Sequence, residues 1–157
     1  MRIDVDVAAR RLTLFKGDKR VSTYRVAVGT KQWPTQPGAW NVKQVIWHPA
    51  WIPPKDEAWA EDAKPKDPGA PDNPLGTAQL VYDPPRTIHG TNHPESIGKA
   101  LSHGSIRMPN ADVERLARQV MEGTGAGKDD AWYREVKRNR TQKQVVDLPQ
   151  LVPITVH

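Results

Sequence analysis

The 157-residue sequence contains no cysteine and no long uninterrupted run of apolar residues. The lack of cysteine excludes disulfide bonds and thiolate metal ligands. A membrane-spanning helix needs about 20 consecutive apolar residues, and nothing in the chain approaches that length, so we expect no transmembrane segment. The first fifteen residues alternate between polar and apolar and lack the apolar centre of a signal peptide. We therefore expect either a cytoplasmic protein or a protein of the periplasm or cell envelope whose leader was removed.

The net charge of the chain does little to narrow its function. The formal net charge of +5 is spread along the chain and favours anionic partners such as cell-wall polymers or nucleic acid. A surface with no charged partner explains the same charge equally well. Six tryptophans would permit base stacking, yet the sequence carries no recognised nucleic-acid-binding motif. We expect no nucleic-acid partner.

Composition favours a single β-rich domain over residues 1–157. The chain has 15 prolines and 11 glycines, which imply many turns and long loops and disfavour a helical bundle. Its length suits one domain with a real core. Alternating and β-branched segments predict strands at 2–7, 10–16, 20–29, 35–48, 77–83, 86–90, 143–148 and 152–156. The expected fold class is mainly β, a β-sandwich or meander.

Two helices are predicted in the C-terminal half, at 110–123 and 128–140. Asn110 is placed to cap the first helix, Asp112 lies in its first turn, where negative charge is favourable, and Gly123 can end it. Apolar residues recur at helical spacing on one face: Val113, Leu116, Ala117, Val120 and Met121.

The proline-rich segment 49–76 is predicted to be a long loop with one helical turn near residues 55–62. Long loops inside compact domains tend to be functional. Trp47, Trp51 and Trp59 lie in or beside this segment. We expect them to pack in the core or the loop, and a wall of a substrate groove is the alternative.

Two short stretches gather residues that can carry chemistry, "IHGT" at 88–91 and "SHGSIRM" at 102–108. Acyl transfer needs a nucleophile, a base and donors for an oxyanion, and these stretches offer Ser105, His89 and backbone amides beside Gly104. Two other interpretations remain open. The histidines can be ordinary partly buried residues with Ser105 in a turn, or His89, His93 and His103 can bind a metal. Proline-rich loops scaffold zinc poorly, and no carboxylate completes the set, so we expect no metal or other cofactor.

The same residues resemble the catalytic domain of the L,D-transpeptidases, the YkuD-type domain. The family motif H-G-T, then I-G, then S-H-G-C-x-R-M/L-x-N compares with "HGTNHPESIGKALSHGSIRMPNADV" at 89–113. Earlier segments are also similar to the family: 11–30 to its opening hairpin, 35–38 to its T-P-x-G turn and 71–76 to its N-P-x-G approach. The resemblance covers roughly residues 1–122 and implies a YkuD-like fold.

The resemblance also implies roles for individual residues. His89 would be the general base, oriented by the backbone carbonyl of Gly90, and Ser105 stands at the nucleophile position. His103 and Arg107 would shape the pocket, with the Gly104 and Ser105 amides as oxyanion donors. The implied partners are peptidoglycan stem peptides with diamino-acid and D-alanine ends, and carbapenem inhibitors. The implied reaction is L,D-transpeptidation of stem tetrapeptides.

Ser105 departs from the family, whose nucleophile is a cysteine. A thiol with a pKa of about 8.5 is readily ionised beside a histidine, whereas a hydroxyl needs concerted base catalysis. We therefore expect a form that is inactive or strongly impaired, and we interpret Ser105 as an engineered cysteine-to-serine replacement, with a natural serine variant as the alternative. An L,D-carboxypeptidase of peptidoglycan recycling and a non-catalytic wall-binding module remain alternative functions. A start at the first strand with no leader favours the recycling carboxypeptidase.

Overall fold

The structure is a computed structural model of residues 1–157, and it describes all of them apart from the side chain of Leu101. Most strands join one eight-stranded sheet in the order β3-β2-β1-β10-β5-β6-β7-β9. Their bounds are β1 Arg2–Asp6, β2 Arg11–Lys16, β3 Lys19–Arg25, β5 Gly38–Trp47, β6 Ala78–Asp83, β7 Arg86–His89, β9 Ile106–Arg107 and β10 Gln144–Val156. Two further strands, β4 Val28–Gly29 and β8 Ala100–Ser102, pair with each other in parallel.

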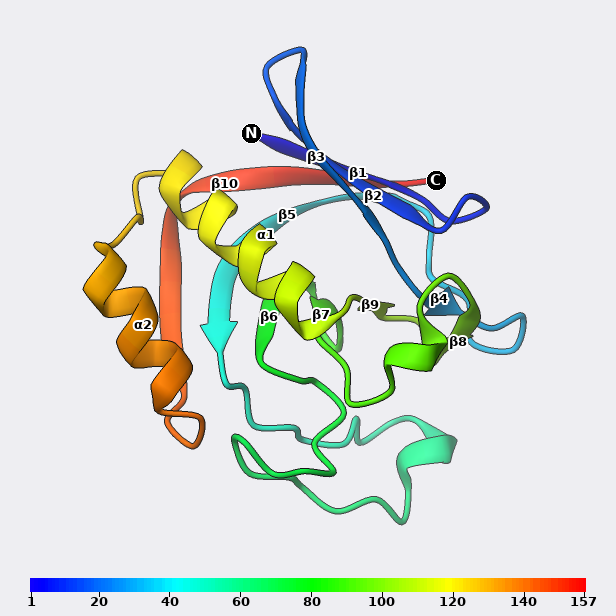
Figure 1. Cartoon of the computed structure of the whole chain (residues 1–157). Helices are drawn as coiled ribbons and strands as arrows, with labels where there is room; N and C mark the ends of the chain where they lie inside the picture. The colour runs from blue at the N-terminus through cyan, green and yellow to red at the C-terminus, as the bar shows by residue number, and fades with distance from the viewer.

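β10 lies inside the sheet and joins the N-terminal strands to the remaining strands, while β3 and β9 are the two edges. β1 pairs in parallel with β10, with Ile3 opposite Ile154, and both termini lie at the top of Figure 1, at opposite ends of this pair of strands. Alternate residues of these strands are buried, and the inward side chains include Ile3, Val5, Val152 and Ile154. The alternation in the sequence therefore marks the face that packs on the core.

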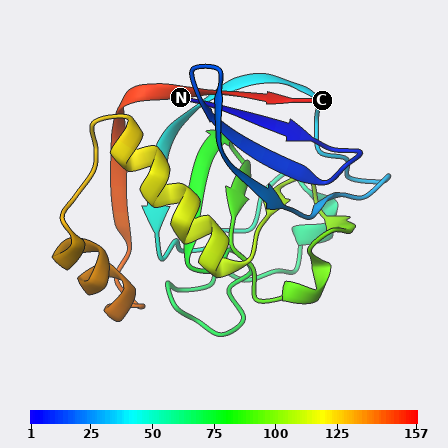
Figure 2. The same cartoon turned by 45° about the horizontal axis from the view of Figure 1, so that its top comes forward.

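Two helices pack on this sheet: α1 Asn110–Gly123 and α2 Asp130–Arg138. The sheet curls around α1, which crosses its concave side, while α2 lies against β10 (Figures 1 and 2). The five apolar residues predicted on one face of the first helix are all buried. Trp47, at the end of β5, is also buried, and its indole N–H lies 3.4 Å from the sulfur of Met121 on α1. The prediction of a mainly β domain with two C-terminal helices is confirmed.

Three local predictions need correction. Strand 20–29 divides into β3 and β4 because the backbone changes partners after Val26: Ala27 exchanges two bonds with Arg107, and the amide of Val28 bonds the carbonyl of Lys99. The strands predicted at 143–148 and 152–156 are one strand, β10, whose register against β5 shifts after Asp147. Asn110 does not cap α1: Pro109 holds the N-cap position, and the Asn110 side chain bonds elsewhere.

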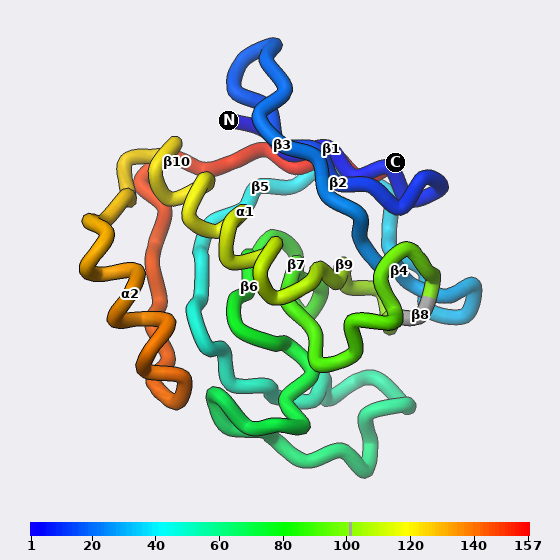
Figure 3. The backbone as a smooth tube through the Cα atoms, viewed as in Figure 1, coloured from blue at the N-terminus to red at the C-terminus, as the bar shows by residue number. Residues whose placement is uncertain are grey.

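The proline-rich segment runs from the end of β5 to the start of β6, below the sheet in Figures 1 and 3. It contains one short 3₁₀ helix, Ala58–Ala60, within the predicted helical turn. Trp51 pairs with Lys66 through two backbone hydrogen bonds, which folds the segment back on itself. No helix among the described residues is both long and apolar enough to cross a membrane.

The interior position of β10 in the sheet leads to a test of stability. Replacing Ile154, which is 1% exposed between β1 and β5, with alanine leaves a cavity and should lower the free energy of unfolding by about 3 kcal/mol. The matched control is Leu151→Ala on the same strand, where a 51% exposed side chain should change it by only about 0.5 kcal/mol. Urea denaturation measures both, and equal effects would contradict this packing.

Candidate functional site

The parallel pairing of β7 with β9 brings the two sequence motifs together. Ile88 pairs with Ile106 and His89 with Arg107, and both isoleucines are fully buried. Because side chains alternate along a strand, Ser105 and Arg107 share the face opposite Ile106, and His89 lies on the face opposite Ile88. His89, Ser105 and Arg107 accordingly line one cleft of about 900 Å³.

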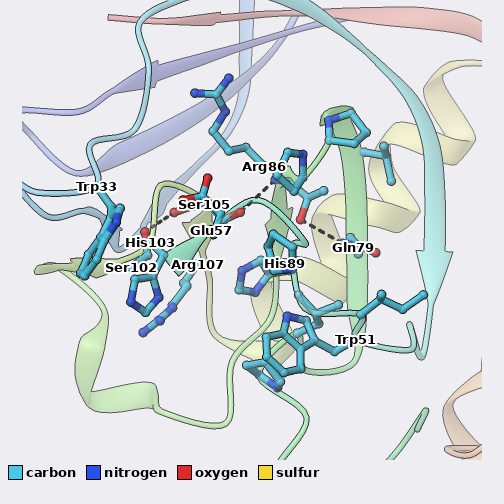
Figure 4. Close-up of a pocket in the computed structure, with 18 of the residues that line it drawn as sticks. Trp33, Trp51, Glu57, Gln79, Arg86, His89, Ser102, His103, Ser105 and Arg107 are labelled. Carbon is cyan, nitrogen blue, oxygen red and sulfur yellow. Dashed lines mark hydrogen bonds between the residues drawn. The ribbon is translucent and has the colours of Figure 1, made fainter. Parts of the chain in front are cut away.

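Ser105 is held by hydrogen bonds on both sides (Figure 4). Its hydroxyl oxygen accepts a bond of 3.0 Å from the amide of Thr87 on β7. Its carbonyl accepts a bond of 2.5 Å from the hydroxyl of Ser102, which in turn accepts one of 3.2 Å from the amide of Gly104. Gly104 has a φ of +111°, a conformation that side chains disfavour. The Gly104 amide, expected to be an oxyanion donor, is therefore engaged with Ser102 in this state.

His89 is buried, and its ring is oriented by the next residue. Its Nδ1 lies 2.5 Å from the carbonyl oxygen of Gly90. A carbonyl only accepts, so Nδ1 carries the proton and Nε2 is the free, basic nitrogen. The pKa of His89 is lowered to about 4, mainly by burial; the hydrogen bond to the Gly90 carbonyl opposes this shift, and the positive charge of Arg107 adds to it. The imidazole is therefore neutral at pH 7, the state that a general base needs.

Two arginines border Ser105 along the cleft and differ in their partners. Arg86 forms an ion pair with Asp83 at the turn between β6 and β7. Arg107 takes part in none of the ion pairs found among the described residues, and burial lowers its pKa. A half-buried guanidinium that lines a cleft without a carboxylate partner is suited to bind an anionic group of a ligand.

An aromatic cluster forms another part of the cleft around His103. The His103 ring stacks on Trp59 with centroids 3.8 Å apart and planes 8° apart. Trp33 meets the same ring edge-on at 4.7 Å. Of the three tryptophans considered from the sequence, Trp47 is in the core, whereas Trp51 and Trp59 line the cleft. The alternative that these tryptophans form a wall of a groove therefore applies to Trp51 and Trp59.

The structure brings together most of the residues singled out from the sequence. His89, His103, Ser105 and Arg107 line the cleft, while Gly90 and Gly104 are buried in the loops that carry them. Among the described residues no hydrogen bond joins His89 to Ser105. His93 lies at the rim and pairs with Glu95, and no three metal-ligating side chains come together in the described part of the chain.

Sequence reasoning missed several contributors. Thr87 acts through its amide, which leaves no signal in the residue type. Trp33 and Arg86 reach the cleft only because the chain folds back, although an arginine three residues before His89 was a visible hint. The sequence predicts Asn110 as a helix cap, whereas its side-chain oxygen accepts bonds from the amides of Thr77 and Thr91.

Comparison with known proteins identifies the family. The model of the L,D-transpeptidase catalytic domain, YkuD, matches residues 1–139. The chain belongs to the L,D-transpeptidase catalytic-domain family. This membership confirms the family that the sequence resembles.

Individual relatives agree with this assignment. A putative L,D-transpeptidase YkuD of Bacillus licheniformis is 36% identical over 124 residues, which cover 78% of this chain and 62% of the relative. The chain thus matches about three fifths of that protein. Among solved structures, a cysteine-to-serine mutant of an Enterococcus faecium L,D-transpeptidase has a TM-score of 0.64 at 16% identity, covering 99% of this chain and 49% of the other. An L,D-transpeptidase in complex with imipenem has a TM-score of 0.54 at 14% identity, with 99% and 57% covered.

The buried imidazole predicts an unusual titration. In an NMR pH titration of this L,D-transpeptidase domain, His89 should titrate with a midpoint near pH 4, because burial disfavours its charged form. His157 is the internal control, since its bond to Asp4 raises its pKa above the ordinary 6.5. Because the unfolded chain takes up a proton on His89 more readily than the folded one, the free energy of unfolding should fall by about 2 kcal/mol between pH values above 6.5 and pH 5. A midpoint at or above that of His157 would contradict the site geometry.

Proposed function

We propose that this domain carries the acyl-transfer site of a peptidoglycan L,D-transpeptidase acting on stem tetrapeptides, with the nucleophile position held by Ser105. The observation that carries the proposal is the neutral, oriented imidazole of His89 on the strand next to Ser105, in one cleft. Family membership supports the same reaction class.

The proposed reaction proceeds in two acyl transfers when a cysteine stands at position 105. His89 Nε2 takes the thiol proton, and the sulfur attacks the carbonyl of the diamino acid at its bond to the terminal D-alanine. The tetrahedral intermediate collapses, the C–N bond breaks, and His89 returns the proton to the leaving amine. An amine of a second stem peptide then attacks the thioester, giving a new amide bond and the free thiol.

The surroundings of position 105 suit a thiolate. The Thr87 amide that now donates to the serine hydroxyl would donate to the sulfur, and two guanidinium groups border it. A thiolate beside the ring would in turn raise the pKa of His89 from about 4, because an opposite charge favours the charged imidazole. A serine hydroxyl gains too little acidity from the same groups. We therefore propose that the Ser105 form is inactive or strongly impaired, while the pocket that binds substrate is retained.

Two alternatives concern the acceptor and the chemistry itself. An L,D-carboxypeptidase would pass the same acyl group to water, and release of tripeptide without a crosslinked product would distinguish it. A non-catalytic wall-binding module would bind stem peptides and remain unmodified even with cysteine at position 105. The Gly104 amide bonds the Ser102 hydroxyl, so it can stabilise an oxyanion only when substrate breaks this bond. A bond that persists with substrate present would favour the non-catalytic module.

The nucleophile assignment predicts the outcome of a direct acylation test. The protein as it stands should show little covalent modification, and Ser105→Cys should acquire one acyl group from a stem tetrapeptide and one adduct from imipenem. The reason is acidity, since the Thr87 amide and His89 can stabilise a thiolate near neutral pH but not an alkoxide. Intact-protein mass spectrometry measures both forms.

Two further variants make this acylation test specific. His89→Ala in the cysteine form should abolish acylation while the protein stays folded by circular dichroism. Modification of the serine form as fast as the cysteine form would mean that Ser105 is itself a competent nucleophile. A cysteine form that neither reagent modifies would refute the proposed acyl transfer.

Arg107 predicts a separate effect on binding. Arg107→Gln should weaken binding of a stem tetrapeptide to the Ser105 form by about 10-fold to 100-fold, because an unpaired guanidinium in the cleft binds a carboxylate of the ligand. Isothermal titration calorimetry measures this without turnover. Arg86→Gln is the matched control, since that side chain is already paired with Asp83 and its loss should weaken binding less. Equal or reversed effects would contradict the role given to Arg107.

A further inference from the structure

Asn110 is the first residue of α1, yet its side chain does not cap the helix. The N-cap position belongs to Pro109 and receives no side-chain hydrogen bond. The Oδ1 atom of Asn110 instead accepts two backbone amides, from Thr77 at 3.2 Å and from Thr91 at 3.1 Å. Thr77 directly precedes β6, and Thr91 follows the end of β7 by two residues. One oxygen therefore joins the beginning of α1 to the loops at one end of two paired strands.

The oxygen fits into a space that two glycines leave open. A Cβ atom on Gly90 would lie 2.1 Å from Asn110 Oδ1, and one on Gly76 would lie 2.2 Å from it. Gly76 also has a φ of +66°, whereas Gly90 does not have a positive φ. Space for the Asn110 oxygen is thus a sufficient reason for glycine at position 90. Two backbone segments have come close enough to this oxygen to exclude any side chain.

The contact reaches His89 through a single peptide group. The amide of Thr91 and the carbonyl of Gly90 belong to the same planar peptide, in which N–H and C=O point in opposite directions. On one side the N–H donates to Asn110, and on the other the carbonyl accepts from His89 Nδ1 at 2.5 Å. Fixing the N–H therefore fixes the direction of the carbonyl. The carbonyl, in turn, determines which ring nitrogen carries the proton.

We propose that Asn110 is a positioning residue for the catalytic base: its side-chain oxygen holds the Gly90–Thr91 peptide so that the Gly90 carbonyl keeps His89 in the Nδ1–H tautomer. This inference rests on the proposed role of His89 as base for its catalytic consequence, but its structural part stands on the hydrogen bonds alone. Asn110 itself touches no reacting group. Its effect on the reaction passes entirely through the peptide and the ring.

Three variants distinguish loss of the hydrogen-bond acceptor from general destabilisation of the fold. Asn110→Ala removes the oxygen and leaves the amides of Thr77 and Thr91 without their partner. Asn110→Asp keeps an oxygen of the same reach that accepts both amides. Asp112→Ala is the control for helix stability, because it removes a favourable charge from the first turn of α1 without contacting the His89 loop.

The first measurement needs no activity and uses the Ser105 protein. Nitrogen-15 NMR of the imidazole should show an Nδ1–H tautomer for His89 in the parent, Asn110→Asp and Asp112→Ala, and a mixture of tautomers in Asn110→Ala. Hydrogen exchange of the Thr91 and Thr77 amides should accelerate in Asn110→Ala alone. An unchanged tautomer and unchanged exchange in folded Asn110→Ala would overturn the proposal. Where Asn110→Ala does not fold, loss of the Nδ1–H tautomer in folded Asn110→Asp would overturn it equally.

The second measurement uses the Ser105→Cys background. Asn110→Ala should slow acylation by imipenem at saturation by on the order of 100-fold, with a much smaller change in the concentration for half-maximal rate, because a misoriented base affects the chemical step. Asn110→Asp should recover most of the rate, and Asp112→Ala should retain it. A rate in Asn110→Ala equal to that of Asp112→Ala would overturn the positioning role. If the cysteine parent itself fails to react while the tautomer shifts as expected, the proposed function fails and the structural inference holds.

Discussion

The parallel pairing of β7 with β9 is the constraint on which the site depends. β9 is only two residues long, and its place is fixed by the burial of Ile106 beside Ile88 and by hydrogen bonds on both edges. Arg107 exchanges two backbone bonds with Ala27, and the amide of Met108 bonds the carbonyl of His89. Because the isoleucines point into the core, the residues on either side of them must face the cleft. The hydrophobic effect thus positions the proposed base, His89, and the residue at the proposed nucleophile position, Ser105, although no hydrogen bond joins them.

The group that orients the His89 ring is a carbonyl, and this has a consequence for the proposed chemistry. A carboxylate would stabilise the imidazolium strongly and support attack by a hydroxyl, as in a serine triad. The Gly90 carbonyl selects the same tautomer but stabilises the charge less, and burial and Arg107 outweigh it. A base of this kind stays neutral until a negative charge forms beside it. A thiol ionises easily and matches such a base, so on the proposed function the site suits sulfur better than the serine hydroxyl at position 105.

Much of this architecture follows from the sequence, and the exceptions share a cause. The helix at 110–123 and the short hairpin strands are specified by local periodicity, which one segment contains in full. Parallel pairing of β1 with β10, and the joining of two predicted strands into β10 across Pro149, depend on partners far along the chain. Within the cleft, His89 and Arg107 could be predicted as site residues from their residue types. The contact of the Thr87 amide with Ser105 could not be predicted, because every residue type except proline carries a backbone amide. The stacking of Trp59 on His103 could not be predicted either, because it depends on the path of the proline-rich loop.

Asn110 shows that an asparagine at a helix start can either cap the helix or bond amides of other segments, and only the structure shows which of the two it does. A helix start favours asparagine as a cap, because its side chain can accept an amide of the first turn. The same acceptor satisfies amides of other segments when these approach closely, and Gly76 and Gly90 permit that approach by lacking side chains. The two glycines and the asparagine therefore form one mechanical unit, although they span residues 76 to 110. On the proposal made above, this unit selects the tautomer of His89, so the geometry of the proposed reaction site depends on a packing requirement outside the cleft.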